Sequence, residues 1–234
     1  MKIVSIMQPT YLPWIGYFAL IDSVDTFVLL DSVQFNKRSW QQRNRIKSAN
    51  GELILTIPVD SKKKQEQNIE SVTLNEPAKN LRKHLKSLEL NYKKAPFFST
   101  YYPTLETLYS ENWTHLAEFN ITLIKQISSW LQIETKFVRS HDIMHTDKKA
   151  LLMLELCKQF DADIYIAVLG AKDYMDESKA FDGSGIAVDY FQFEQPTYNQ
   201  LFNGFIPNLS ALDLLFNAGP QSREIMLKGL KEKG

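Results

Sequence analysis

Several features that often reveal function are scarce or missing in this chain of 234 residues. Its single cysteine, Cys157, excludes a disulfide framework and a thiolate metal site. No apolar run is long enough for a transmembrane helix, and the run at residues 3–7 is too short for a signal peptide. Neither sign of charge is in excess, because 27 Lys and Arg balance 27 Asp and Glu. We therefore expect a cytoplasmic protein with no membrane span and no general nucleic-acid binding.

The glycine-rich phosphate fingerprints are absent as well. The chain has neither GxGxxG nor GxxxxGK[ST], the usual signatures of dinucleotide and nucleoside-triphosphate sites. The segment WIGYF follows the first expected strand, where nucleotidylyltransferases carry a His-x-Gly-His signature, but only Gly16 matches that signature. With 44% hydrophobic and 23% charged residues, the composition is that of an ordinary globular protein.

Strand-like and helix-like patterns alternate along most of the chain. Short apolar runs predict strands at 2–7, 26–31, 52–59, 135–140, 163–169 and 186–193. Helical patterns lie within 9–24, 76–92, 115–131, 147–160, 171–181 and 209–217. The alternation predicts an α/β fold: a largely parallel, Rossmann-like three-layer sheet with helices on both faces. We expect a single domain, 1–234, with a helix-rich cap segment at approximately 75–131.

Two of the helical patterns carry more detailed predictions. The helix within 115–131 has an apolar face with the spacing of a core contact, formed by Leu116, Phe119, Leu123, Ile127 and Trp130. The last helix, within 209–217, is expected to close at Gly219 and Pro220, because Gly caps a helix and Pro cannot continue it. Cys157 lies on the apolar face of its own helix and is expected in the core.

The most distinctive segment is FNKRSWQQRNRIK at residues 35–47. It places one Trp among five cations: Lys37, Arg38, Arg43, Arg45 and Lys47. Since strand-like runs flank it, we expect an ordered loop. Arginines grip phosphate oxygens through paired donors, and a Trp face stacks on a base. The segment therefore predicts an anion site, with a solvated, charged surface turn as the alternative.

Other polar residues follow the expected strands. Ligands of parallel sheets bind at the carboxyl ends of the strands. Gln8 and Tyr11 follow the first strand, Asp31 ends the second, and Lys172 follows a later one at a helix start, where anions are favoured. Each has a plain structural alternative, such as a strand break or a turn cap.

The histidines divide into two groups. His141 and His145 lie in a connector, so we expect no metal there. His84 lies between basic neighbours on a helix near the expected ligand side, where adjacent cations favour its neutral form. It is a candidate general base, and a partly buried structural histidine is the alternative.

Taken in order, several segments resemble one known family. QPTYLPWIGYF, DTFVLLDSVQF, KRSWQQRNRIK, RKHL with NYKKAPFF, GAKDYMD and PNLSALDLLFNAGP are similar to the WbqC-like family, over residues 3 to 220. The chain departs from the family at AVLGAKDY, where members usually have a Ser-Gly turn. Members lie among bacterial genes for O-antigen and related surface polysaccharides. The resemblance implies an N-acyltransferase that moves glycine, or another small acyl group, to an amino sugar.

Such a reaction suggests roles for the residues singled out above. The partner would be a nucleotide-linked amino sugar, whose diphosphate and base suit the cations and the tryptophans. Its amine must lose a proton, so His84 or Asp31 is the expected catalytic base. A carbonyl oxygen would need donors, for which Gln8 or Asn44 would serve. The expected substrate-binding residues are Gln8, Tyr11, Trp14, Lys37, Arg38, Trp40, Arg43, Asn44, Arg45 and Lys172.

The acyl donor and the competing functions stay open at this point. A thioester on an acyl carrier protein, an aminoacyl-tRNA, or ATP with an amino acid would each supply the activated group, and no cofactor is certain. Alternatives are another nucleotide-handling enzyme (an ATP-dependent ligase or a nucleotidylyltransferase-like protein), a noncatalytic RNA-binding module, or a scaffold of a glycan-assembly complex. The balanced net charge disfavours the RNA-binding alternative.

Overall fold

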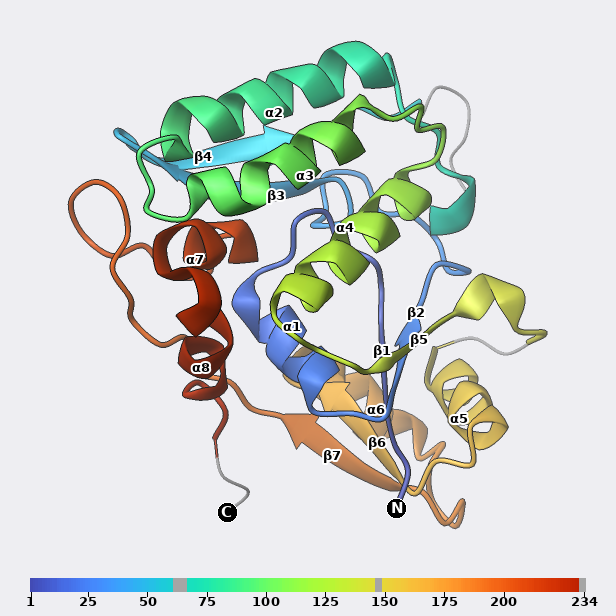
Figure 1. Ribbon diagram of the computed structural model, residues 1–234. Helices are drawn as coiled ribbons and strands as arrows, with labels where there is room; N and C mark the ends of the chain where they lie inside the picture. The colour runs from blue at the N-terminus through green and yellow to red at the C-terminus, as the bar shows by residue number, and fades with distance from the viewer. Residues whose placement is uncertain (61–66, 146–148, 232–234) are drawn as a thin grey trace.

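A five-stranded parallel sheet forms the centre of the molecule (Figure 1). The computed structural model describes residues 1–60, 67–145 and 149–231. The strands are β1 (Ile3–Met7), β2 (Thr26–Leu29), β5 (Lys136–Arg139), β6 (Ile164–Val168) and β7 (Ala187–Phe191), in the order β5-β2-β1-β6-β7. Every pair in this sheet is parallel. The predicted strands in these five places are confirmed.

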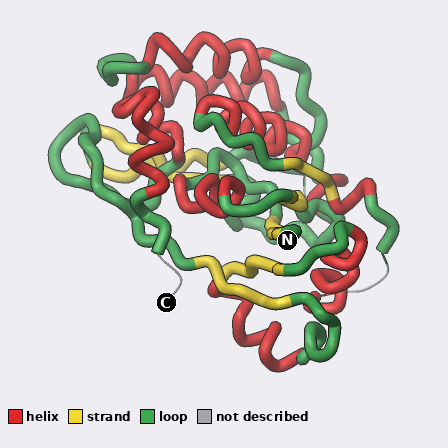
Figure 2. Tube along the Cα trace, turned by 60° about the horizontal axis from the view of Figure 1, so that its bottom comes forward, coloured by secondary structure: helices red, strands yellow, loops and turns green. Residues whose placement is uncertain are grey.

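Helices cover both faces of the sheet, as predicted (Figures 1 and 2). One face carries α1 (Ile15–Asp22), α4 (Leu116–Trp130), α7 (Ala211–Ala218) and α8 (Ser222–Leu227). The other face carries α5 (Lys149–Gln159) and α6 (Lys172–Ser178). Short 3-10 turns, η1 (Ile69–Ser71), η2 (Ser140–Asp142), η3 (Leu169–Ala171) and η4 (Gly219–Gln221), complete the helical elements. The first two residues expected in α5, 147 and 148, lie outside the described residues.

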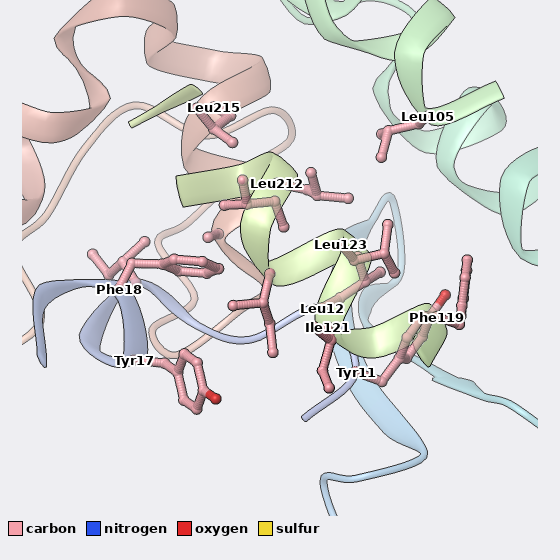
Figure 3. Packing of buried hydrophobic residues seen from close by; sticks show 14 of the residues in the cluster. Tyr11, Leu12, Tyr17, Phe18, Leu105, Phe119, Ile121, Leu123, Leu212 and Leu215 are labelled. Atoms are coloured by element: carbon pink, nitrogen blue, oxygen red, sulfur yellow. The ribbon is translucent and has the colours of Figure 1, made fainter. Parts of the chain in front are cut away.

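Strand alternation divides the core between the two faces. Phe27 and Leu29 of β2 face the α1 and α4 side, whereas Val28 and Leu30 face α5 and α6. Figure 3 shows the first of these clusters, in which side chains of α1, α4 and α7 meet. Four residues of the predicted core face of α4 are fully buried, and Trp130 packs against them. Cys157 is buried in the second cluster, as predicted.

The cap is a second layer above the sheet (top of Figure 1), made of the hairpin β3 (Arg43–Ser48) and β4 (Gly51–Thr56) with helices α2 (Pro77–Tyr92) and α3 (Phe98–Ser110). Two predictions were wrong here. Residues 43–47 form a strand rather than a loop, and 52–59 does not belong to the parallel sheet, because β4 pairs antiparallel with β3. Only two residues separate β3 from β4, which is too short for a parallel crossover.

The middle of the chain is rich in helices, as expected. Pro77 occupies the first turn of α2, where its missing N–H costs nothing. The expected cap segment included α4, but α4 leads back from the cap to β5 and packs on α1 and α7 (Figure 3). The expectation of one domain over 1–234 stays a prediction.

The C-terminal region departs from the sequence prediction in one respect. Gly219 does cap α7, with a φ of 56°, and a Cβ there would lie 2.4 Å from the Phe97 ring. However, α7 is not the last helix, because Pro220 lies within the 3-10 turn η4, which leads into α8. Proline is tolerated at that first turn, where no N–H is required. Among the described residues, no helix is long and apolar enough to cross a bilayer.

The strand order sets where a ligand is expected. From β1 the chain adds β2 and β5 on one side, and then β6 and β7 on the other. The direction reverses between β1 and β6, and ligands of such sheets bind outside the carboxyl ends of the strands at this point. In Figure 1, β1 rises from the N-terminus toward the cap, so this edge lies beneath the cap.

Candidate active site

The turn after β1 is tied directly to the basic segment. The Gln41 side-chain amide donates to Gln8 Oε1 at 2.7 Å, and the Tyr11 N–H donates to the Trp40 carbonyl at 3.0 Å. Buried Asn120 of α4 donates to the Gln41 carbonyl at 2.7 Å. The fold therefore brings together the turn after β1 and the basic segment, which the sequence analysis had singled out separately. The basic segment leads into the cap and lies over the end of β1.

The three cations of β3 share one face of the strand. Arg43, Arg45 and Lys47 alternate with Asn44 and Ile46, which are buried on the opposite face. The alternation was visible in the sequence, but the strand-like runs on both sides of the segment favoured a loop between them. As a result, the cations form a row with fixed spacing, which a solvated turn would not provide.

Trp40 lies against two of these cations. The guanidinium carbons of Arg43 and Arg45 lie 5.5 and 5.4 Å from the centroid of the Trp40 ring. Arg45 is also held by Glu52 at 3.2 Å and by the Asn208 carbonyl at 3.2 Å. The Nε atoms of both arginines are buried and have no hydrogen-bond partner among the described residues. Two pre-oriented donors without acceptors are an arrangement that an anion would complete.

The remaining predicted residues of the basic segment are exposed at its tip. Trp40 is 47% exposed, so part of its side chain is accessible to a ligand. Lys37 and Arg38 are exposed, and the Arg38 N–H donates to Gln42 Oε1 at 3.3 Å. Arg38 adopts a left-handed conformation, with a φ of 61°. Their proposed contact with a substrate stays a prediction.

Tyr11 and Asn44 have internal partners. Tyr11 is fully buried, and the Asn44 amide donates to the carbonyls of Tyr11 and Leu12 at 3.0 and 2.8 Å. These bonds hold the turn after β1 to β3. The geometry thus indicates that Tyr11 and Asn44 position the site, while direct contact with a substrate stays a prediction.

Trp14 and Lys172 lie against aromatic rings. The Trp14 ring fills the space above Gly16, where a Cβ would lie 2.4 Å from it, and meets the Phe193 ring edge-on at 5.4 Å. Gly16 is thus explained by packing. The exposed Lys172 lies 5.6 Å from the centroid of the Tyr190 ring, at the carboxyl end of β6. It occupies the predicted edge of the sheet.

His84 belongs to a closed chain of hydrogen bonds. Its Nε2 lies 3.1 Å from the Thr56 carbonyl, which can only accept, so Nε2 carries the proton. Its Nδ1 therefore accepts from the Tyr11 hydroxyl at 2.9 Å, and Tyr109 donates to Tyr11 at 2.8 Å. Burial lowers the pKa of His84 to about 4. Burial, rather than neighbouring cations, keeps the ring neutral, and both ring nitrogens have partners within the protein. Catalysis by His84 stays a prediction, which this geometry does not favour.

Asp31, the other candidate base, is also enclosed. It is fully buried at the end of β2, where Arg139 Nε donates to Oδ2 at 2.7 Å. The Ser140 hydroxyl and the His141 N–H donate to Oδ1 at 3.2 and 3.0 Å. These contacts join the ends of β2 and β5. Catalysis by Asp31 stays a prediction, which this geometry does not favour.

The pair His141 and His145 is not a ligand set. His141 contributes its backbone to the Asp31 network, and His145 Nε2 lies 2.7 Å from Ser32 Oγ. In residues 1–60, 67–145 and 149–231, no group of three or more His, Cys, Asp or Glu is placed to hold a metal.

A polar cluster that the sequence analysis missed lies at the other end of the cation row. Lys47 is 1% exposed, and its backbone N–H donates to the Tyr92 hydroxyl at 2.9 Å. Tyr92 in turn donates to Asp213 Oδ2 at 2.8 Å. Asp213 is fully buried, and its Oδ1 has no hydrogen-bond partner among the described residues. Burial raises the pKa of Asp213. The sequence did contain one sign of this cluster, because Asp213 is a single acidic residue within the apolar run SALDLLF.

Two cavities accompany these features. One of about 340 Å³ adjoins the cluster and is lined by Lys47, Ser48, Ala49, Gly51, Phe202 and Asn203. The other, of about 760 Å³, lies at the amino ends of the strands and is lined mainly by polar groups, including the ion pair of Asp22 with Arg223. The smaller cavity is lined by the buried, charged Lys47, so we consider it the better candidate for a catalytic site.

Comparisons with known proteins agree with the motifs. The chain matches the family model described as the WbqC-like protein family over residues 8–225. An uncharacterized protein of Mycobacterium tuberculosis is 38% identical over 228 residues, which cover 97% of this chain and 98% of that protein. No solved structure matches the chain significantly.

Proposed function

Since the chain belongs to the WbqC-like protein family, we propose that it is an enzyme of bacterial surface-polysaccharide biosynthesis. It transfers a glycyl or other small acyl group to the amine of a nucleotide-linked amino sugar. The family membership is consistent with an enzyme, and the resemblance of the sequence motifs suggests this reaction. The acyl donor is an activated ester or thioester, with an aminoacyl-tRNA or an acyl carrier protein as the partner that delivers it.

One observation supports this proposal most strongly. Beside the half-exposed ring of Trp40, the Nε–H groups of Arg43 and Arg45 have no hydrogen-bond acceptor among the described residues. A diphosphate supplies acceptors for the two Nε–H groups. A pyrimidine base supplies a flat surface for the indole. A nucleoside diphosphate joins both features in one molecule, and the sugar it carries extends along the cation row toward Lys47.

Calorimetric titration with a UDP- or dTDP-linked 4-amino sugar tests the binding half of this proposal. Arg43→Gln should weaken affinity by about 10- to 100-fold, because a charge-assisted hydrogen bond contributes roughly 1.5–3 kcal/mol. Arg82→Gln, which changes an exposed arginine of α2, is the matched control and should bind like the wild type. Equal affinity of the two variants would contradict the assignment of the cation row.

Mass spectrometry tests the reaction itself. The wild-type protein, the amino sugar and a glycyl donor should give an amide product that is heavier by one glycyl unit. Glycyl-tRNA, a glycyl thioester on a carrier protein, and glycine with ATP are compared as donors. A sugar without the 4-amino group should bind but give no product, since the amide forms at that nitrogen. Absence of product with every donor, together with RNA retained at moderate salt, would favour the RNA-binding alternative.

A further inference from the structure

The cluster around Asp213 contains a hydrogen-bond acceptor and a donor that could each bind a substrate. Asp213 Oδ2 accepts from Tyr92, whereas Oδ1 is buried and has no hydrogen-bond partner in the part of the chain that the structure describes. Lys47 donates through Nζ to Gln200 Oε1 at 3.1 Å and to the Gly204 carbonyl. An ammonium has three donors, so one N–H remains for another acceptor. A buried acceptor and a buried donor thus lie in one cluster, and unfilled buried groups of this kind are uncommon in native proteins.

Tyr92 connects the Lys47 backbone to the Asp213 carboxyl. Its hydroxyl accepts from the Lys47 backbone and donates to Asp213, so β3 and α7 are fixed relative to each other. Burial, and secondly the charge of Asp213, raise the pKa of Tyr92 well above its usual value, so Tyr92 stays a donor. The Tyr198 hydroxyl and the Gln200 side chain also lie near the Asp213 carboxyl and help to stabilise its charged form. Among the described residues, none makes a hydrogen bond of normal geometry to Oδ1, so this oxygen remains available as a proton acceptor.

Residues 200–206 form a strap that accepts both hydrogen bonds of the Lys47 ammonium, and Phe202 and Asn203 of this strap line the 340 Å³ cavity. The Gln200 side chain closes the strap through two hydrogen bonds to the Ile206 backbone, both at 2.9 Å. Within the strap, Phe202 has a φ of 64°, which is strained for an aromatic residue, yet its ring is 43% exposed. Asp213 has no exposed surface, so a substrate reaches it only when the segments packed around it, which include Gln200 of the strap, move apart.

We propose that Asp213 and Lys47 form the acyl-transfer centre beneath the strap, with Asp213 as the proton acceptor and Lys47 as the donor to the carbonyl oxygen. This inference rests on the function proposed above. The catalytic base is then Asp213, whose carboxyl keeps one oxygen without a partner among the described residues. The polar atoms of His84 and Asp31 already have partners.

Acyl transfer at this centre begins with attack by the amine and ends with departure of the leaving group. The amine nitrogen of the sugar bonds to the acyl carbon and gives a proton to Asp213 Oδ1. The negative charge that develops on the carbonyl oxygen is stabilised by the remaining N–H of Lys47. When the carbonyl forms again, the bond to the leaving group breaks, and the leaving oxygen or sulfur takes the proton from Asp213. The raised pKa of Asp213 makes it a better proton acceptor than an ordinary carboxylate.

Turnover and binding, measured separately, test the centre. Asp213→Asn should lower kcat by about 1,000-fold, and Lys47→Met by about 100-fold, with less than a tenfold change in nucleotide-sugar affinity. Retained affinity and an unchanged circular dichroism spectrum show that the variants fold. Asp213→Glu should recover part of kcat, since it restores the carboxylate. Asp22→Asn, which changes a partly buried carboxylate at the opposite edge of the sheet, is the control and should keep full kcat.

The outcomes separate the two proposals. A wild-type protein that makes the acylated sugar, with an Asp213→Asn variant of equal kcat, would overturn the centre and leave the proposed function intact. A wild-type protein that makes no product with any donor would overturn the proposed function and the centre with it. Loss of kcat in Asp213→Asn with normal affinity, together with recovery in Asp213→Glu, would support both.

Discussion

Two buried polar networks meet the same hairpin, and they differ in how completely their groups are paired. The first runs from Tyr109 through Tyr11 and His84 to the Thr56 carbonyl of β4, and every polar atom in it has a partner. The second joins Lys47 of β3, which lines a cavity, to Tyr92 and Asp213, and within the described part of the chain it leaves Asp213 Oδ1 unpaired.

The comparison teaches that the type of residue is a poor guide to its role. A histidine near the ligand edge suggested a base, but its ring closes a structural chain between α2 and the turn after β1. An aspartate inside an apolar helix suggested nothing, yet its carboxyl keeps an unoccupied oxygen. A complete network stabilises the fold, whereas an incomplete one retains capacity for a ligand.

The largest expected effect concerns the pH dependence of the complete network. The pKa of His84 falls from 6.5 when unfolded to about 4 when folded. A lowered pKa stabilises the folded state fully above pH 6.5, and this stabilisation decreases as the pH falls toward 4. The loss approaches about 3 kcal/mol, from 1.36 kcal/mol per pKa unit.

Urea denaturation of the wild type and His84→Gln at pH 7.5 and pH 4.5 measures this effect. Other carboxylates titrate in the same window, so the difference between the two proteins isolates the histidine. The variant should lose less stability on acidification than the wild type. An identical loss in both proteins would contradict the assignment of a buried, neutral His84.

Tyr92→Phe tests the incomplete network. The substitution removes the hydrogen bond to Asp213 Oδ2 and the acceptor for the Lys47 N–H. We expect kcat to fall by about 30-fold, which corresponds to roughly 2 kcal/mol for a charge-assisted hydrogen bond. The measurement is the steady-state rate of amide formation at saturating sugar. Unchanged kcat in the folded variant would mean that Tyr92 is only a packing residue.

Tyr109→Phe makes the corresponding change in the complete network. It removes the donor to Tyr11 but leaves the ring packed against Phe119, 5.0 Å away. We expect a loss of about 1 kcal/mol in the free energy of unfolding, with kcat unchanged. Thermal unfolding and the same rate measurement check both parts. A fall in kcat without a fall in stability would remove the distinction between the two networks.

Phe202→Gly should have the smallest effect. Glycine adopts a φ of 64° without strain, so relief of the left-handed conformation should offset the entropy that glycine adds to the unfolded chain. The net change in unfolding free energy should stay below about 1 kcal/mol. If Phe202 gates the cavity, the variant should also release product faster, as seen in the burst phase. A destabilisation of several kcal/mol would show instead that the exposed ring is a core contact.

Much of the fold was determined by the sequence. Local periodicity located the five strands of the parallel sheet, the apolar face of α4 and the glycine cap of α7. These features depend on residues close together in the chain, whose spacing alone decides which side of a helix or strand is buried. The ordered motifs also identified the family, because their succession covers nearly the whole chain.

Only the tertiary structure decided the pairing of the hairpin and the roles of the buried polar groups. The alternation of residues 43 to 47 fits a strand, but its partner depends on the turn that follows. Tyr92 and Asp213 are separated by 121 positions, and no local pattern links them. Whether a polar side chain is structural or reactive depends on which of its atoms other segments leave unpaired. That pairing exists only once the chain is folded, because it is a sum over distant contacts.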